Sequence, residues 1–326
     1  MKLEEEIFNI QSEEDFIKTC LKVFRYQYEH TLVYQKYCDL LKVNPDEVKK
    51  TAEIPFLPIE FFKSHKVLNK NCDADIQFMS SGTTGQQRSI HYVADTDLYE
   101  KSCLLTFEKF YGSVEDFTVL ALLPSYLERD NSSLVHMAND FIKRSQSSES
   151  GFYLNNLDEL VKTLENPEIK KKKVLLIGVT FALLDLAENY HVDLENIIVM
   201  ETGGMKGRRK EMIREEVHQL LKKSFNTDKI HSEYGMTELL SQAYSKGHGV
   251  FDLPKQMQVL IRDTEDPLQL IGENKNGGIN VIDLANLHSC SFIATQDLGR
   301  KLTKSKFEVI GRFDNSDIRG CNLMAL

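Results

Sequence analysis

Short apolar runs alternate with amphipathic stretches between residues 117 and 224, and this alternation constrains the fold more than any other feature of the chain. Three runs are almost wholly apolar, as in strands that are buried on both faces: 117–123, 174–177 and 197–200. Between and after them, helices are predicted at 131–146, 157–165, 180–190 and 208–224. Strands that alternate with helices predict βαβ units and a largely parallel sheet with helices on both faces.

The rest of the chain has a different character. Residues 1–50 have a helical pattern, with Phe16, Cys20, Val23 and Phe24 on one face. The proline-punctuated segment IPFLPIEFF that follows cannot be a regular helix throughout. After about residue 245, short strand-like runs are separated by Gly, Asn and Asp. The predicted fold class is therefore α/β, a doubly wound mixed sheet with a β-rich C-terminal subdomain.

Three segments are predicted from this organisation. They are a helical N-terminal segment at 1–50, an α/β body at 51–244 and a β-rich subdomain at 245–326.

Charge and cysteine usage exclude several classes of protein. The 326 residues include 40 basic and 49 acidic side chains, and this net charge of -9 argues against a general nucleic-acid binder. The acidic N-terminus resembles neither a signal peptide nor a transit peptide, and no apolar stretch approaches the length of a membrane span. The six cysteines are scattered without a C-x-x-C pair, which disfavours a zinc site and suits reduced thiols. A cytoplasmic enzyme is the expectation.

The stretch SSGTTGQQR at 80–88 concentrates hydroxyl side chains and glycines directly after the apolar run 76–79. Hydroxyls and bare backbone amides in one loop can hold an anion, and phosphate is the usual candidate. Ser, Thr and Gly are also ordinary loop residues, and taken alone the stretch favours a surface turn.

One glycine-containing stretch follows a predicted strand, and another follows the short run 229–231. Gly203 and Gly204 (ETGGMKG) come where the strand 197–200 ends, and ligands of parallel sheets bind at the carboxyl ends of strands. A tight strand-to-helix turn explains these glycines equally well. In YGMTE, Glu238 offers an oxygen ligand to Mg²⁺ and Thr237 a hydroxyl to phosphate. The alternative is an exposed acidic residue at a helix start.

Two charged stretches lie nearer the C-terminus. In TQDLG, the carboxylate of Asp297 is suited to accept both hydroxyls of a ribose, although Asp-x-Gly alone is a turn. In GRFDNSDIRG, Arg312 supplies a guanidinium able to pair with phosphate or ribose oxygens, although alone it would be a charged turn.

In their order and composition, these stretches resemble the adenylate-forming superfamily of acyl-CoA synthetases, luciferases and peptide-synthetase adenylation domains. SSGTTGQQR is similar to its phosphate loop, YGMTE to its magnesium and phosphate segment, ATQDLG to its ribose-binding segment and GRFDNSDIRG to its hinge motif. GVTFALL is similar to the stretch that lines the acyl pocket, which implies pocket residues Val179, Phe181 and Leu184. The resemblance extends from about residue 55 to the end of the sequence.

The resemblance implies ATP and Mg²⁺ as cofactors and a carboxylic acid as substrate. It implies nucleotide-binding roles for the following residues: Ser80, Ser81, Gly82, Thr83, Thr84, Gly85, Arg88, Gly203, Gly204, Tyr234, Gly235, Thr237, Asp297 and Arg312. Arg88 stands where the family usually has lysine, so the charge is kept but the geometry is not. Thr84 and Glu238 are expected to take part in catalysis, with Glu238 as the metal ligand.

The sequence departs from the superfamily pattern after the hinge motif. The family continues into a mobile C-terminal domain with a catalytic lysine, whereas this sequence stops six residues after Gly320. Adenylation is then expected to be slow unless another cation, such as Lys206 or Arg208, substitutes. The short acyl-protein synthetases of the bacterial luciferase operon are more similar. They load an activated fatty acid onto their own cysteine and pass it to a reductase.

Cys321 lies in the matching place and is the expected catalytic acyl acceptor, because a thiolate can attack the acyl-AMP anhydride. A buried, inert cysteine is the alternative.

Three functions therefore stay open. The first is an AMP-forming acyl-protein synthetase that activates a carboxylic acid, with a fatty acid expected, and transfers the acyl group through Cys321 to a reductase or carrier protein. The second is a ligase that uses coenzyme A as the acyl acceptor. The third is a non-catalytic nucleotide- or acyl-binding subunit of a reductase complex.

Overall fold

The computed structural model describes residues 2–81, 87–124, 131–203 and 212–313. Their contacts divide the chain into two compact units. The central unit comprises residues 72–254, and the split unit comprises residues 1–71 together with 255–326. The split unit therefore takes its residues from both ends of the sequence.

The central unit alternates strands with helices. Its strands are β2 (Ile76–Met79), β3 (Ile90–Val93), β4 (Phe117–Leu122), β5 (Gly151–Phe152), β6 (Lys173–Gly178), β7 (Ile198–Thr202), β8 (His231–Tyr234), β9 (Ala243–Ser245) and β10 (Val250–Asp252). Its helices are α5 (Thr96–Tyr111), η2 (Val114–Asp116), α6 (Ser133–Arg144), α7 (Leu157–Glu165), α8 (Pro167–Lys170), α9 (Thr180–Asn189) and α10 (Arg214–Phe225).

Parallel strands form the middle of this unit. The order β8-β7-β6-β4-β5 is parallel throughout, and β9 and β10 continue it antiparallel beyond β8. All six residues of β4 are buried, and so are five of the six in β6, as expected of strands covered on both faces. β2 and β3 form a separate antiparallel hairpin.

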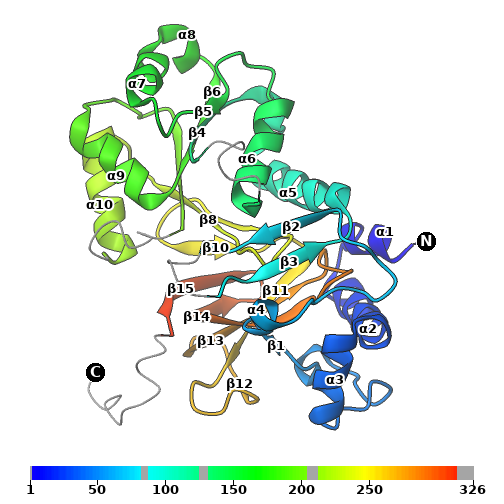
Figure 1. Ribbon diagram of the computed structural model, residues 1–326. Coiled ribbons are helices and arrows are strands. Elements are labelled where there is room, and N and C mark those ends of the chain that lie inside the picture. The colour runs from blue at the N-terminus through cyan, green and yellow to red at the C-terminus, as the bar shows by residue number, and fades with distance from the viewer. Residues whose placement is uncertain (1, 82–86, 125–130, 204–211, 314–326) are drawn as a thin grey trace. The chain divides into compact units, whose positions relative to one another are not determined.

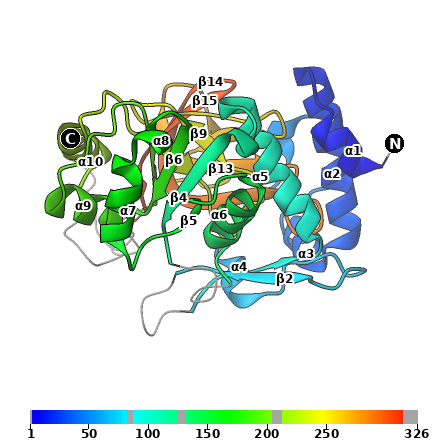
Figure 2. The same ribbon diagram turned by 90° about the horizontal axis from the view of Figure 1, so that it is seen from above.

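Helices cover both faces of the parallel strands. The chain steps from β6 through α9 to β7 and through α10 to β8, always to the next strand, so right-handed crossovers place α9 and α10 on the same face. Figure 1 shows α9 and α10 on one side of β4 and β6 and α5 and α6 on the other, and Figure 2 shows the same separation from above. The predicted doubly wound arrangement is confirmed.

The predicted helices at 157–165 and 180–190 agree with α7 and α9 within one residue, and 131–146 contains α6. In the helix predicted at 208–224, the spacing of Ile213, Val217, Leu220 and Leu221 predicts one apolar stripe, and this prediction is only half right. Val217 and Leu221 are buried, but Ile213 is 62% exposed and Leu220 is 45% exposed. Ile213 is the N-cap of α10, where the chain has not yet turned its side chains onto the sheet.

The split unit combines helices from the N-terminal part with antiparallel strands from the C-terminal part. Its helices are α1 (Leu3–Phe8), α2 (Glu13–His30), α3 (Leu32–Leu40), η1 (Thr51–Glu53) and α4 (Phe61–Ser64). Its strands are β1 (Leu57–Pro58), β11 (Met257–Arg262), β12 (Leu270–Ile271), β13 (Asn276–Asp283), β14 (Phe292–Thr303) and β15 (Lys306–Arg312). The order β12-β11-β13-β14-β15 is antiparallel, and β1 pairs with β14 in parallel.

Helix α2 explains why the two ends of the sequence share one unit. Phe16, Cys20, Val23 and Phe24 are all buried on the face that the sequence predicts. The fully buried Gln27 amide donates to the carbonyls of Asn286 and Leu287, and Phe24 and Phe292 make an edge-to-face ring contact. These contacts group 1–71 with 255–326, whereas the three-segment division at residues 50 and 244 stays a prediction about domains.

Candidate active site

The carboxyl ends of the parallel strands bring several predicted motifs to one edge of the central unit. β6 ends at Gly178, directly before the predicted acyl-pocket stretch, and β7 ends next to Gly203. β8 ends at Tyr234, the first residue of YGMTE. In the strand registers, Gly178 pairs with Glu201 and Thr202 pairs with Glu233, so these strand ends lie side by side. Such an edge is where ligands bind in parallel α/β sheets.

The hydroxyl-rich loop joins the two strands of the β2–β3 hairpin. Ser80 closes its base, because its backbone N–H donates to the Ser89 carbonyl at 3.1 Å and its Oγ accepts from the Ser89 N–H at 3.0 Å. Ser81 and Arg88 are exposed. Gly82, Thr83, Thr84 and Gly85 lie outside the described residues, as do Gly204, Lys206, Arg208 and Cys321.

Glu238 lies in a turn after β8. It is 4% exposed, and a backbone bond of 3.1 Å from Leu239 N–H to the Met236 carbonyl closes the turn. The alternative of an exposed acidic residue at a helix start is therefore wrong. Thr237 beside it is half-buried, and Gly235 is exposed.

His91 ties this turn to the hairpin. The imidazole is fully buried, and its Nδ1 lies 2.9 Å from the Thr237 carbonyl oxygen. A carbonyl oxygen accepts, so Nδ1 carries the proton. One side chain on β3 thus holds the hydroxyl-rich hairpin and the Glu238 turn together.

The predicted acyl-pocket residues lie at the start of α9. Val179 is its N-cap, and Val179, Phe181 and Leu184 are 1%, 7% and 2% exposed. The backbone approaches closely here: a Cβ on Gly178 would lie 2.9 Å from Leu122 Cβ. Only glycine fits at the end of β6 without displacement of its neighbours.

Sequence reasoning missed a pair of buried carboxyl groups at the same edge. Glu201 and Glu233 lie on the neighbouring strands β7 and β8 and are 8% and 9% exposed. The Thr202 hydroxyl donates to Glu233 at 2.8 Å, and His218 Nε2 lies 3.7 Å from Glu201 Oε2. A glutamate within a strand carries no local signal of this kind, because its partners come from other elements.

The two carboxyl groups have different pKa values. Burial raises the pKa of Glu233 to about 7, and the charge of Glu201 adds to this effect. Burial also acts to raise the pKa of Glu201, but hydrogen bonds from His218 and Thr180 and the charge of Arg214 outweigh it and lower that pKa below its ordinary value. Gly235 accommodates this pair, because a Cβ there would overlap the Glu233 carboxyl group.

We expect Glu233→Gln to change the pH dependence of folding stability. The folded-state pKa of about 7 lies above the ordinary value of 4.5, so the contribution of Glu233 is fully present below pH 4.5 and is lost as the pH rises through 7. The amide does not titrate and still accepts from Thr202. The free energy of unfolding of the variant minus that of the parent should therefore increase by about 1–3 kcal/mol from about pH 5 to about pH 8. Urea unfolding at both pH values checks this, and an unchanged difference would contradict it.

Asp297 and Arg312 lie in the split unit, on paired strands. Asp297 is opposite Arg312 in the β14–β15 register, and Arg312 Nε lies 3.4 Å from Asp297 Oδ1. The Asp297 side chain is 14% exposed and the Arg312 side chain is 66% exposed. Asp297 therefore stands within a strand, and the alternative of a simple Asp-x-Gly turn is wrong. The ribose-like motif thus lies beside Arg312, which stands in the described part of the hinge-like motif.

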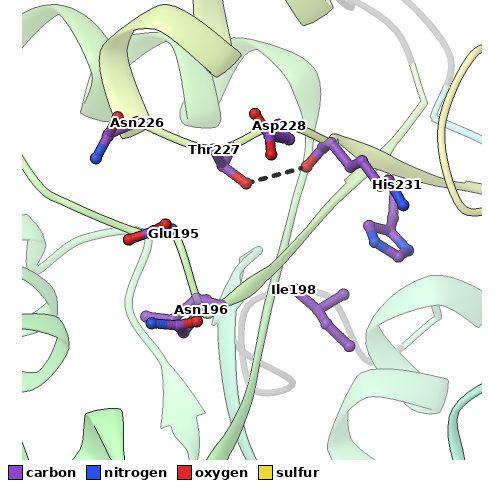
Figure 3. A pocket seen from close by; sticks show the side chains of 9 residues that line it. Glu195, Asn196, Ile198, Asn226, Thr227, Asp228 and His231 are labelled. Carbon is purple, nitrogen blue, oxygen red and sulfur yellow. Dashed lines mark hydrogen bonds between the residues drawn. The ribbon is translucent and has the colours of Figure 1, made fainter.

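A polar pocket of about 400 Å³ lies elsewhere in the central unit. Figure 3 shows that Asn196, Thr227 and His231 line it, and Thr227 Oγ1 donates to the Lys229 carbonyl at 3.4 Å. Its residues precede β7 and β8 or are the first residues of these strands, so it lies at their amino ends. None of the predicted site residues lines it.

The described residues also bear on metal and membrane binding. They contain no group of three or more His, Cys, Asp and Glu side chains arranged to hold a metal ion. Mg²⁺ usually binds through one or two carboxylates together with substrate phosphates and water, so the single carboxylate of Glu238 fits that role. Within the same ranges, no helix has both the length and the apolar character required to cross a bilayer.

Comparison with solved structures defines the class of the fold. A 2-hydroxyisobutyryl-CoA ligase in complex with 2-HIB-AMP and CoA matches 94% of this chain and 70% of its own, with a TM-score of 0.69 and 14% identity. ATP-bound MatB from Rhodopseudomonas palustris matches 72% of this chain, with a TM-score of 0.53 and 16% identity. This chain spans 47% of the length of that MatB structure. The fold is that of adenylate-forming ligases.

Residues 6–97 match the family model of acyl-protein synthetase, LuxE. The matched range includes the N-terminal helices and the whole β2–β3 hairpin. The comparison with curated protein sequences found no match. The predicted resemblance to the adenylate-forming superfamily is confirmed at the level of the fold, and the resemblance to acyl-protein synthetases is confirmed over residues 6–97.

Proposed function

We propose that this protein activates a carboxylic acid with ATP as an acyl adenylate and transfers the acyl group to its own Cys321 before a partner protein receives it. The observation that carries the proposal is the link between His91 and Thr237, which joins the hydroxyl-rich hairpin to the Glu238 turn at the carboxyl edge of the parallel strands. The family-model match over residues 6–97 supports the acyl-protein synthetase type.

In the first step, a carboxylate oxygen of the acid attacks the α-phosphorus of ATP. The bond between the α-phosphorus and its bridging oxygen breaks, and pyrophosphate leaves with that electron pair. Glu238 would hold Mg²⁺, which supplies positive charge to the triphosphate oxygens. The hydroxyl-rich loop would bind the phosphates, and Asp297 would bind the ribose hydroxyls. Val179, Phe181 and Leu184 would line an apolar site for the acyl chain, which favours a fatty acid.

In the second step, a cysteine thiolate attacks the acyl carbon and AMP leaves. Four described cysteines are poorly suited to this step, because burial raises the pKa of each thiol: Cys20, Cys38, Cys103 and Cys290. A buried thiol is a weak nucleophile because little thiolate forms. Cys72 is half-buried, and Cys321 lies outside the described residues. This supports Cys321 as the acceptor and provides Cys72 as a comparison.

ATP–pyrophosphate exchange with the purified chain tests the adenylation step. Exchange should require Mg²⁺ and an added acid, and a fatty acid such as myristate should support it better than acetate. The chain should then retain radiolabelled acyl groups without coenzyme A. Acyl-CoA formation without protein labelling would favour the coenzyme A ligase instead. ATP binding without exchange for any acid would favour the non-catalytic subunit.

A further inference from the structure

The side chain of Thr180 connects two motifs that the sequence treats separately. Thr180 is the first residue of α9, beside the predicted acyl pocket, and is 3% exposed. Its Oγ1 lies 2.7 Å from Glu201 Oε1 and 3.2 Å from the Gly203 carbonyl oxygen. The same hydroxyl thus contacts the carbonyl of the first glycine of the pair and a carboxylate on β7, the strand that leads into the pair.

Glu201 is a charged, well-positioned hydrogen-bond acceptor for this hydroxyl. It is buried, its pKa is lowered below the ordinary value, and its second oxygen lies 3.7 Å from His218 Nε2 on α10. A hydroxyl has one proton, and the shorter contact to a carboxylate oxygen is the stronger hydrogen bond. The Thr180 proton therefore makes a three-centre hydrogen bond, with its stronger component to Glu201 and its weaker component to the Gly203 carbonyl.

The Gly203 turn depends on such contacts for its position. Gly203 has φ +56°, in the left-handed region, and within the described part of the chain a Cβ there would meet no atom within 4 Å. The positive φ is the reason for glycine at this position, because other residues rarely adopt it. The Thr180 hydroxyl, 3.2 Å from the Gly203 carbonyl oxygen, is one of the contacts that hold this turn.

We propose that Thr180 is a positioning residue, whose hydrogen bond to Glu201 sets the start of the acyl-pocket helix α9 against the Gly203 turn of the nucleotide site. This inference rests on the proposed function. If α9 orients the acid and the Gly203 turn borders the nucleotide, then the Thr180–Glu201 bond fixes the distance between the reacting carboxylate and the α-phosphorus. Misplacement by about 1 Å can reduce a reaction rate by about a hundredfold.

The test compares Thr180→Val, which removes the hydroxyl at nearly constant shape, with Thr180→Ser, which keeps it. Thr118→Val is the matched control. Thr118 is a fully buried threonine on β4 whose hydroxyl donates to Ser147 at 2.9 Å, and it lies near the amino ends of the strands. Thr118→Val therefore removes a comparable buried hydrogen bond away from the candidate site.

Thr180→Val should lower the kcat of ATP–pyrophosphate exchange by about tenfold or more, while the KM for ATP changes by less than about threefold. Thr180→Ser should restore most of the rate, and Thr118→Val should retain it. Hydrogen–deuterium exchange should show faster exchange of peptides around Gly203 in Thr180→Val only.

Two failures are distinguishable. If the parent protein catalyses exchange and Thr180→Val matches it, or loses no more than Thr118→Val, this inference is overturned and the proposed function stands. If the parent protein shows no exchange with any acid, the proposed function is overturned and this role with it.

Discussion

Cys321→Ser is expected to catalyse ATP–pyrophosphate exchange at the parent rate while retaining no hydroxylamine-labile acyl group. Adenylation uses the hydroxyl-rich loop, Glu238 and Asp297, so the loss of one thiol outside these segments leaves it intact. A serine hydroxyl ionises far less readily than a thiol and is therefore a weaker nucleophile. Any acyl group that it accepts is bound as an oxygen ester, which is more stable than a thioester. Thioester labelling should therefore fall at least about a hundredfold, as judged by intact-mass spectrometry after incubation with ATP, Mg²⁺ and myristate.

Cys72→Ser is the matched control for this experiment. Cys72 is half-buried, and burial together with the charge of Asp73 raises the pKa of its thiol. This variant should retain full thioester labelling. An unchanged thioester mass in Cys321→Ser would refute the role of Cys321 as the acyl acceptor. A loss of labelling in Cys72→Ser alone would identify Cys72 as the acceptor.

Glu238→Ala and Asp297→Ala should affect different measurements. If Glu238 holds Mg²⁺, its loss should lower the exchange rate by about a hundredfold and leave the AMP affinity within about twofold, because AMP binding needs no metal at that position. If Asp297 binds the ribose, its loss should weaken ATP and AMP alike, by about tenfold or more, because a charged hydrogen-bond acceptor is removed. Calorimetric titration of AMP and a magnesium series in the exchange assay separate the two effects.

Arg312→Ala is the control for Asp297. The Arg312 guanidinium lies 3.4 Å from the Asp297 carboxylate, so Asp297→Ala also removes that ion pair. Arg312 is two-thirds exposed, and an exposed pair of this kind contributes about 0–1 kcal/mol. A larger loss of AMP affinity in Asp297→Ala than in Arg312→Ala would indicate direct contact with the nucleotide. Equal losses of AMP affinity in Glu238→Ala and Asp297→Ala would contradict the division of roles.

The sequence predicts those parts of the fold that have a local physical signature. β4 and β6 are recognisable because both faces are buried, which leaves a continuous apolar run. Helix α5 was missed, although it is sixteen residues long. Its buried residues include polar ones, Ser102 and Thr106, beside Leu98 and Phe107. This mixture weakens the apolar periodicity that identifies a helix.

The residues of the candidate site also separate into those with a local signal in the sequence and those without one. Gly203 and Glu238 stand in recognisable motifs at strand ends, whereas Glu201 and Glu233 have no motif of their own. Glu201 contacts Thr180 and His218, and Glu233 contacts Thr202. Each partner stands on a different element from its glutamate, so only the folded chain reveals this environment.

The division of the chain into a central unit and a split unit has a consequence for biosynthesis. The central unit is continuous in sequence, so all of its strands are available once residue 254 has left the ribosome. The N-terminal helices must wait longer, because Gln27 and Phe24 find their partners at Asn286 and Phe292. Domains generally fold as units during synthesis, beginning with those that are complete. Residues 1–71 therefore make their native contacts with 255–326 only after the central unit is complete, and until then the apolar face of α2 is available to chaperones.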